Sequence, residues 1–189
     1  MTRVYVGIGS NHQREFHIHA ALSALQRCYR RVRWSSAYAS GAVNGFSGEF
    51  LNLVVGFDTT DSATQVRRHL RRIEAEFGRR RDGTTGSRIT LDLDLLLFGS
   101  WHGRVEGIRL PHSDIERYAF VLRPLAEIAG SEHHPVSGET FQAMWARFPR
   151  EAQPLRLVGR REIPDRTRPW MSLPQVLAGS GEGEPVSQL

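Results

Sequence analysis

Apolar and polar residues alternate in four short segments of the chain, and apolar residues recur at helical spacing in segments that connect them. The alternation predicts strands at residues 4–8, 32–38, 50–58 and 90–98. The helical spacing predicts helices at about residues 13–28 and 63–77. Weaker helical patterns follow at residues 113–129 and 139–147. The chain therefore has the order strand–helix–strand–strand–helix–strand, followed by further helices.

The third and fourth strands each have one apolar face and one face that is partly polar. The residues expected to face a core are Leu51, Leu53, Val55 and Phe57 in the third strand, and Leu91, Leu93, Leu95 and Leu97 in the fourth. The opposite face carries Phe50, Asn52, Val54 and Gly56 in the third strand, and Asp92, Asp94 and Leu96 in the fourth. An exposed aromatic ring, an amide and two carboxylates are unusual on a sheet face whose only role is to pack against other elements.

This order of elements predicts a ferredoxin-like α+β fold. Its antiparallel sheet would carry helices on one face and leave the other face open, with a C-terminal helix and a tail added. Six of the nine prolines lie from Pro149 onward, together with a Gly- and Ser-rich end. We therefore expect one folded domain at residues 1–149 and a Pro/Gly-rich tail at residues 150–189.

The charged residues are distributed unevenly. The 189 residues carry a net charge of +5, and every basic residue is arginine. Residues 67–81 contain seven arginines and two glutamates, so this segment alone accounts for the net charge. A local anion site explains that concentration better than a basic surface for nucleic acid, which would be spread more widely. The absence of lysine excludes Schiff-base chemistry and a P-loop lysine.

Composition also limits the cellular location and the partners that we expect for this chain. Hydrophobic residues make up 40% of it, enough for a packed core, and the single Cys28 excludes an internal disulfide. No apolar run approaches the roughly 20 residues of a membrane span, and the N-terminus leads into a strand without a signal-peptide pattern. We expect a cytoplasmic monomer whose partners are small molecules, with neither a membrane nor nucleic acid among them.

Asp92 and Asp94 are the strongest candidates for chemistry. Two residues apart on a strand, their carboxylates lie on one face with Cα atoms about 6.5–7 Å apart. Like charges this close repel unless a cation lies between them, and carboxylate oxygens suit Mg²⁺. Such a pair could bridge two Mg²⁺ ions. The alternative is the solvated polar face of a half-buried strand, which is where strand acids usually lie.

Three consecutive arginines, Arg79–Arg81, follow the second helix beside a Gly/Thr-rich loop. Guanidinium groups next to a metal-binding carboxylate pair are what the transfer of a polyphosphate group requires. Glu74 could pair with Arg71 on the surface of the helix, an interaction that needs no functional explanation. His112 precedes a helix start, where it could contact an anion or help to cap the helix.

Several strings of residues occur in a characteristic order along the chain. They are Gly9-Ser10-Asn11, Phe50-Leu51-Asn52, Arg72-Ile73-Glu74 with Gly78-Arg79, Thr90-Leu91-Asp92-Leu93-Asp94-Leu95, Leu110-Pro111-His112 and Phe120-Val121-Leu122 with Pro124-Leu125. Together they resemble the hydroxymethyl-dihydropterin pyrophosphokinases of folate biosynthesis. The likeness covers roughly residues 3–148, and the ordered set is specific although no single string is.

The resemblance implies the α+β fold predicted above, and transfer of the terminal pyrophosphoryl group of ATP to the hydroxymethyl group of a dihydropterin, with release of AMP. It implies that Asp92 and Asp94 hold two Mg²⁺ ions. It also implies that Phe50 and Phe120 lie on either side of the pterin ring, with Asn52 at the ring edge. The other residues implied in catalysis are Arg79, Arg88 and His112. Those implied in ATP binding are Arg71, Glu74, Arg81, Arg109, Arg117 and Tyr118.

The chain departs from the family at several positions. The family's usual arginine lies three residues before the first aspartate, where this chain has Ile89, so Arg88 is one residue out of register. Arg88 can reach phosphate only if the strand start bulges or the preceding loop folds over the site. Tyr118 stands two residues before Phe120, where the family favours arginine. The loop 82–87 lacks the tryptophan often found there.

Two alternatives stay open from the sequence. One is a diverged pterin-binding protein with weak or no turnover, which the departures from the family would allow. The other is an RNA-binding module, because a ferredoxin-like sheet with exposed aromatic rings and arginines can stack bases. Against the second alternative, the aspartate pair would repel phosphates unless it is loaded with metal. Magnesium-dependent ATP binding would therefore separate an enzyme from an RNA-binding module.

Overall fold

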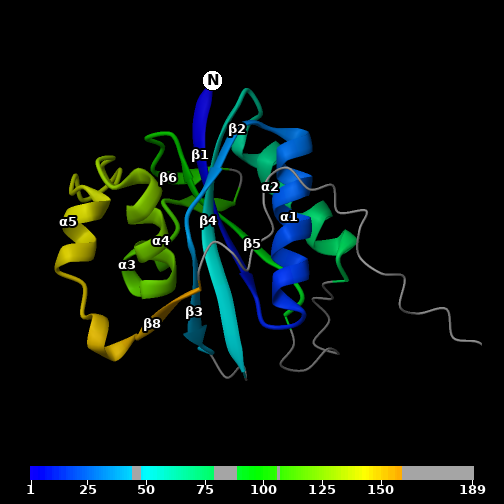
Figure 1. Cartoon of the computed structure of the whole chain (residues 1–189). Coiled ribbons are helices and arrows are strands. Elements are labelled where there is room, and N and C mark those ends of the chain that lie inside the picture. The colour runs from blue at the N-terminus through cyan, green and yellow to red at the C-terminus, as the bar shows by residue number, and fades with distance from the viewer. Residues whose placement is uncertain (44–47, 79–88, 106, 159–189) are drawn as a thin grey trace, which may run out of the picture.

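The computed structural model describes residues 1–43, 48–78, 89–105 and 107–158, and Figure 1 shows its elements around a central sheet. The six strands of this antiparallel sheet are β1 (Thr2–Ser10), β2 (Arg30–Trp34), β3 (Ala37–Gly41), β4 (Glu49–Thr59), β5 (Asp92–Phe98) and β8 (Leu155–Val158). Their order is β5-β1-β4-β3-β8, and β2 also pairs with β4. The helices are α1 (Arg14–Cys28), α2 (Ala63–Glu76), α3 (Asp114–Arg117), α4 (Ala119–Ala129) and α5 (Phe141–Ala146). A separate hairpin consists of β6 (Gly103–Val105) and β7 (Ile108–Leu110).

Helices α1 and α2 cover the first face of the sheet, as the sequence predicts. The alternating residues Leu51, Leu53, Val55 and Phe57 of β4 are all buried in the core beneath these helices. Helix α2 begins with a capping box, in which Ser62 and Gln65 each accept a hydrogen bond from the other's backbone N–H. The order of the elements and the α+β class are confirmed.

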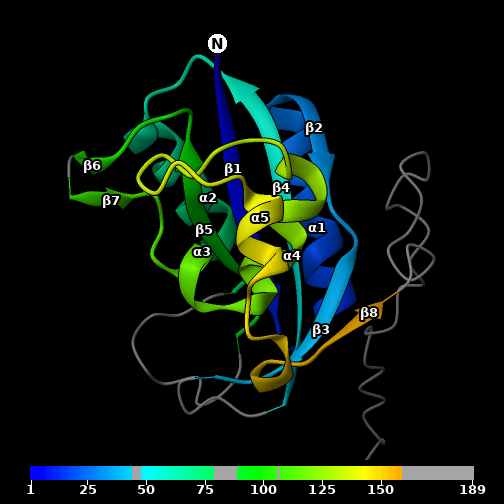
Figure 2. The ribbon, with the colours of Figure 1, turned by 90° about the vertical axis from the view of Figure 1, so that its left-hand side faces the viewer.

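The second face of the sheet is not open along its whole length, so the expectation of helices on one face only is wrong. Figure 2 shows α4 and α5 in front of the sheet, opposite α1. They cover a second apolar core to which the sheet contributes Tyr5, Val54, Leu96 and Leu97. Gly56 makes room for this packing, because a Cβ at that position would lie 2.8 Å from Cε1 of Tyr5. Only part of this face is left for a ligand.

A β-bulge in β5 overturns the orientation predicted for Leu97. Tyr5 pairs with Leu97 whereas the next residue, Val6, pairs with Leu95, so Leu96 is an extra residue in the ladder. The insertion places Leu97 on the second face with Leu96, while Leu95 stays on the first. His112 N–H donates to the carbonyl oxygen of Leu96 at 2.9 Å, which ties the bulge to the segment after β7.

The segment predicted as one strand at residues 32–38 forms two strands, β2 and β3. The chain is interrupted at Ser35, whose N–H donates to the carbonyl of Val54 at 3.0 Å and whose hydroxyl accepts the Val54 N–H at 3.1 Å. β2 and β3 consequently pair with different parts of the same strand, β4. A side-chain oxygen that takes over one ladder hydrogen bond explains how the pairing continues past the break.

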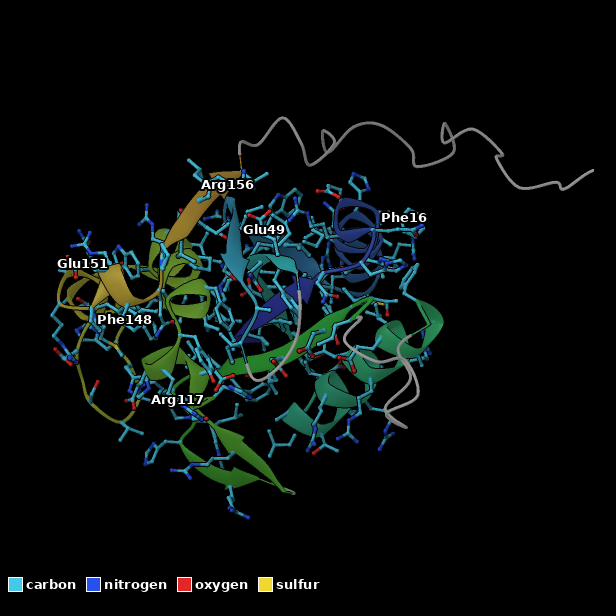
Figure 3. All side chains as sticks on the ribbon, turned by 90° about the horizontal axis from the view of Figure 1, so that it is seen from below. Phe16, Glu49, Arg117, Phe148, Glu151 and Arg156 are labelled. Carbon is cyan, nitrogen blue, oxygen red and sulfur yellow. The ribbon has the colours of Figure 1, made fainter. Side chains whose placement is uncertain are left out.

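The domain continues beyond the boundary predicted at residue 149. β8 pairs with β3 at the sheet edge, and Val158 is buried in the first core. Figure 3 shows Arg156 of β8 beside Glu49 of β4, and the two side chains form a salt bridge of 2.9 Å. Hydrogen bonds from Arg14 and Arg156 lower the pKa of Glu49. Residues 159–189 of the predicted tail lie outside the described residues.

No helix among the described residues is long and apolar enough to cross a membrane.

Candidate active site

The second face of the sheet contains a trough along β1, where the residues that face this side are Gly7 and Gly9. Gly7 lies between Val54 and Asp94 in the strand pairing, and Gly9 lies between Asn52 and Asp92. Because alternate residues of a strand share one face, the two glycines leave a gap between the amide of β4 and the carboxylates of β5. The sequence alone predicts that Asn52 and the two aspartates lie on polar strand faces. Only the strand register shows that Gly9 pairs with Asn52 on one side and with Asp92 on the other.

A small cavity of about 50 Å³ occupies this trough. Gly7, Gly9, Asn52, Asp92 and Asp94 line it from the sheet, and Asp114, Phe120 and Val121 line it from α3 and α4. The volume suits a few water molecules rather than a bicyclic ring. A flat ligand therefore needs more room than this cavity offers, and Phe120, which lines it, is only half-buried.

Asp92 and Asp94 are the residues that could hold Mg²⁺ together with a phosphate substrate. Both side chains are partly exposed on the same face of β5, and both line the cavity. Within the described ranges, no group of three or more His, Cys, Asp or Glu side chains could hold a metal ion. Mg²⁺ typically keeps several waters and takes only one or two carboxylates together with substrate phosphates, so two aspartates fit this metal.

The backbone around Asp92 is held by polar contacts from two sides. Glu74 of α2 is 2% exposed, and its Oε1 accepts the N–H of Leu93 at 3.0 Å. Ser10 donates its hydroxyl to the carbonyl oxygen of Thr90 at 2.7 Å. The interpretation of Glu74 as a surface partner of Arg71 is therefore wrong, because this carboxylate is buried against the edge strand of the sheet. These contacts fix the position of the aspartates relative to the helix and the first turn.

Asn11 reveals an irregularity at the start of β5. Its N–H donates to the carbonyl oxygen of Ile89 at 3.1 Å, and its Oδ1 accepts the N–H of Ile89 at 2.6 Å. Since Gly9 pairs with Asp92, the single residue Ser10 lies opposite both Thr90 and Leu91. A two-against-one arrangement of this kind is a bulge. This irregularity precedes Asp92, the first residue of β5, and Arg88 itself lies outside the described residues, so its reach toward phosphate stays a prediction.

Phe120 belongs to a stack of side chains at the start of α4. Its ring stacks on that of Tyr118 with centroids 4.9 Å apart and an interplanar angle of 16°. The guanidinium of Arg117 lies over the ring of Tyr118, 5.4 Å from the ring centroid. The tyrosine that replaces the family's arginine therefore supports the aromatic wall of the cavity. Tyr118 does not line the cavity itself, whereas Phe120 does.

Glu127 anchors α4 to β3 and so holds the helix that carries Phe120. Its Oε1 accepts both the N–H and the hydroxyl of Ser36 at 2.9 Å, and its Oε2 accepts the hydroxyl of Tyr38 at 2.8 Å. Burial, together with the hydrogen bond to Glu127, raises the pKa of Tyr38 to about 12. Sequence reasoning did not assign Glu127, Ser36 or Tyr38 any part in the site, because their contact depends on tertiary packing.

The structure brings together some of the predicted site residues and separates others. Asn52, Phe120, Asp92 and Asp94 surround one cavity, and Asp114, which the sequence analysis did not single out, joins them. Phe50 is half-buried on the same strand face but does not line this cavity. His112 does not line it either; its Nδ1 accepts the N–H of Asp114 at 3.3 Å, so it positions a residue that does.

The predicted ATP-binding residues are more dispersed. Arg71 on α2, Arg109 on β7 and Arg117 at the end of α3 are all exposed, and none of them lines the cavity. Figure 3 shows Arg117 pointing outward between α3 and the β6–β7 hairpin. The predicted residues Arg79, Arg81 and Arg88 lie outside the described residues, so their contact with phosphate stays a prediction.

Two carboxylates that could hold Mg²⁺, beside a polar cavity on an α+β sheet, are typical of metal-dependent enzymes of phosphoryl or pyrophosphoryl transfer. The model of the 7,8-dihydro-6-hydroxymethylpterin-pyrophosphokinase family matches residues 5–130. Since this match covers more than half of the chain, the chain belongs to that family, and the resemblance seen in its sequence is confirmed.

Individual relatives agree with the family match. The chain is 41% identical over 132 residues to the 2-amino-4-hydroxy-6-hydroxymethyldihydropteridine pyrophosphokinase of Pseudomonas aeruginosa, a match that covers 67% of this chain and 80% of the relative. It is 36% identical over 133 residues to the enzyme of the same name from Haemophilus influenzae, covering 68% and 82%. The enzyme of the same name from Bacillus subtilis is 34% identical over 144 residues, covering 73% and 85%.

Solved structures support the fold independently. The crystal structure of wild-type HPPK-DHPS from Plasmodium falciparum with SDX-DHP superposes with a TM-score of 0.60 at 12% sequence identity. The match covers 78% of this chain but 43% of the other, so this chain spans less than half of that protein. At such low identity the similarity concerns the fold alone, and it confirms the α+β architecture.

Proposed function

We propose that this chain transfers the terminal pyrophosphoryl group of ATP to the hydroxymethyl group of 6-hydroxymethyl-7,8-dihydropterin and releases AMP. The observation that carries the proposal is the trough of Gly7 and Gly9, with Asn52 on one side and Asp92 and Asp94 on the other, in a member of this family. An amide that would bind a ring edge and carboxylates that would hold metal-bound phosphates then lie on one sheet face, with only β1 between them.

The reaction asks little covalent chemistry of the protein. The hydroxymethyl oxygen forms a bond to the β-phosphorus of ATP, the bond from that phosphorus to the oxygen shared with the α-phosphate breaks, and the hydroxyl proton leaves to solvent. Alignment of the two substrates and neutralisation of charge account for most of the catalysis in transfers of this kind. The rigid strands β4 and β5 suit that task, because they hold both binding subsites in one sheet.

Asp92 and Asp94 would hold two Mg²⁺ ions, which when bound offset the charge of the triphosphate at the point of transfer. Asn52 would bind the pterin edge, and Phe120 would stack on the ring once it moves away from the trough. Phe50, which lies beside Asn52 on the same face, is proposed for the other side of the ring. Arg79, Arg88 and His112 are proposed to act on the phosphates.

AMP release is the direct test of this function. The full chain with ATP, Mg²⁺ and 6-hydroxymethyl-7,8-dihydropterin should release AMP in proportion to pterin consumed, and release none when the pterin is left out. Asp92→Ala is the matched control, because it removes one metal ligand. Pterin binding without AMP release would instead indicate a binding protein without turnover. RNA binding without magnesium-dependent ATP binding would indicate an RNA-binding module.

A further inference from the structure

Gln153 connects the C-terminal segment of the chain to the junction between α3 and α4. Its Oε1 accepts the N–H of Ala119 at 2.9 Å, and its Nε2 donates to the carbonyl oxygen of Arg117 at 2.9 Å. These two backbone groups lie on either side of Tyr118, the residue that separates the two helices. Gln153 lies outside residues 5–130, to which the family model matches, so membership of the family assigns it no part in the site.

Both backbone groups need a partner from outside the helices. Arg117 ends α3 and Ala119 begins α4, and the last C=O and first N–H groups of a helix have no partner within it. Ala119 is fully buried, so water cannot freely replace the amide of Gln153 at its N–H. One side-chain amide, which carries an acceptor and donors, satisfies both groups. Because an unpaired buried group is costly, the conformation of this junction depends on Gln153.

Gln153 is itself held in place by its neighbours in the chain. Its N–H donates to the carbonyl oxygen of Arg150 at 3.1 Å, which closes the 3₁₀ turn η1 (Arg150–Ala152). Two residues after Gln153, β8 begins, and its first residue, Leu155, pairs with Ser40 of β3. The amide therefore reaches α4 from a segment that is tied to the sheet.

The α3–α4 junction carries side chains of the candidate site. Tyr118 has an extended backbone, with φ −125° and ψ 128°, and this conformation separates the path of α4 from that of α3. Phe120, which lines the cavity, follows two residues later, and its ring stacks on that of Tyr118. The N–H of Tyr118 donates to the carbonyl oxygen of Asp114 at 3.0 Å, so a second residue that lines the cavity is tied to the same turn. A shift of this turn would therefore move one wall of the cavity.

We infer that Gln153 is a positioning residue for pterin binding, which holds the α3–α4 turn so that Phe120 meets the ring by moving only its side chain. The inference rests on the proposed function. Gln153 does not line the cavity, so its effect on a ligand has to pass through the turn that it holds. Part of the pterin affinity then depends on a C-terminal segment that the family match does not include.

A double-mutant cycle tests this route. Titration of the full chain with 6-hydroxymethylpterin should show that Gln153→Ala weakens pterin binding by about 3–10-fold, the range expected for one neutral hydrogen bond. Adding Gln153→Ala to Phe120→Ala should change the pterin affinity by less than about twofold, because two residues that act through one contact are not additive. The affinity for Mg-ATP in the absence of pterin should stay as in wild type, whereas a general loss of folded structure would weaken the binding of both ligands.

Three further variants separate the hydrogen bonds from side-chain volume and from the turn itself. Gln153→Met keeps the length of the side chain without the amide, and should lose pterin affinity as Gln153→Ala does. Gln153→Glu keeps an acceptor for the buried N–H of Ala119 and should lose less affinity, so it tests the inference even if Gln153→Ala fails to fold. Glu151→Ala changes an exposed residue of η1, which Figure 3 shows at the outer edge of the molecule, and should bind pterin as wild type does. Melting temperatures identify any variant that fails to fold.

The outcomes distinguish this inference from the function on which it rests. If wild type binds 6-hydroxymethylpterin and releases AMP, but Gln153→Ala binds pterin as wild type does, the inference is wrong and the function stands. The inference is also wrong if the losses caused by Gln153→Ala and Phe120→Ala simply add, or if Gln153→Met binds pterin as tightly as wild type. Wild type that binds no pterin would overturn the proposed function and the inference together.

Discussion

Replacing Gly9 with alanine is expected to block pterin binding without unfolding the protein. The new Cβ would lie 3.1 Å from Oδ1 of Asn52 and 4.0 Å from Cβ of Asp92, on the floor of the trough between them. Gly9 does not have a positive φ, so alanine meets no backbone strain at this position. The side chain of Asn52 has to shift by a few tenths of an ångström, and the ligand loses the surface on which it lies.

The magnitude follows from two effects at the same atom. Displacing Oδ1 removes a hydrogen bond of about 0.5–1.5 kcal/mol. A methyl group forced into a fitted space costs about 1–3 kcal/mol. The dissociation constant for pterin should therefore rise by roughly 10–1,000-fold, since about 1.4 kcal/mol corresponds to a factor of ten. The folded state itself should be unaffected or slightly stabilised, because alanine restricts the unfolded chain more than glycine does.

Gly7 provides the matched control on the same strand and face. A Cβ at Gly7 would meet only the side chain of Leu96, at 3.6 Å, which is an ordinary van der Waals contact. Gly7→Ala should therefore bind pterin within about threefold of wild type and gain roughly 0.4–1 kcal/mol of stability. Fluorescence titration with 6-hydroxymethylpterin and thermal unfolding measure both quantities. Wild-type affinity in Gly9→Ala would refute the assignment of the trough as the pterin site, and an equal loss in both variants would show that contact with Asn52 is not what makes Gly9 necessary.

Other changes test the neighbouring parts of the site. Asp92→Ala should abolish AMP release while the melting temperature of the metal-free protein stays the same or rises, because a like-charge pair is removed; an unfolded variant, or normal turnover, would count against a metal role. Phe120→Ala should weaken pterin binding by about 1–3 kcal/mol with little change for ATP, and equal losses for both ligands would indicate a core residue instead. Arg88→Ala should lower kcat by about 10–1,000-fold if its guanidinium neutralises the transferred group, and an unchanged kcat would show that it points away. Tyr38 has its pKa raised from about 10 to about 12, so its contribution to stability is complete below pH 10 and is lost as the pH rises through 12; in Tyr38→Phe, chemical denaturation should show a smaller loss of stability across that range.

Periodicity in the sequence predicted β1, β4 and β5 and most of the first core, and it grouped the polar residues of the candidate site. Residue alternation in β4 assigned Leu51 and Asn52 to opposite faces, and both assignments are confirmed because a strand that pairs without interruption keeps its period of two. The same period placed Asp92 and Asp94 together. These features depend on residues close together in the chain, so local patterns are enough to predict them.

Tertiary structure decided where that pattern is interrupted and which distant segments meet. The bulge at Leu96 turns the side chain of Leu97 to the second face of the sheet. Helices α4 and α5 cover part of that face, which the sequence predicts to be open. Neither feature follows from the local pattern of β5. The pairing of Asn52 with Gly9, and of Gly9 with Asp92, forms the trough because of the register between three strands. Glu74 gains its role through a hydrogen bond to a residue 19 positions away in the chain. The sequence thus determined which groups are available, whereas the register, the bulges and the packing of distant elements determined which of them share one site, because those contacts are non-local.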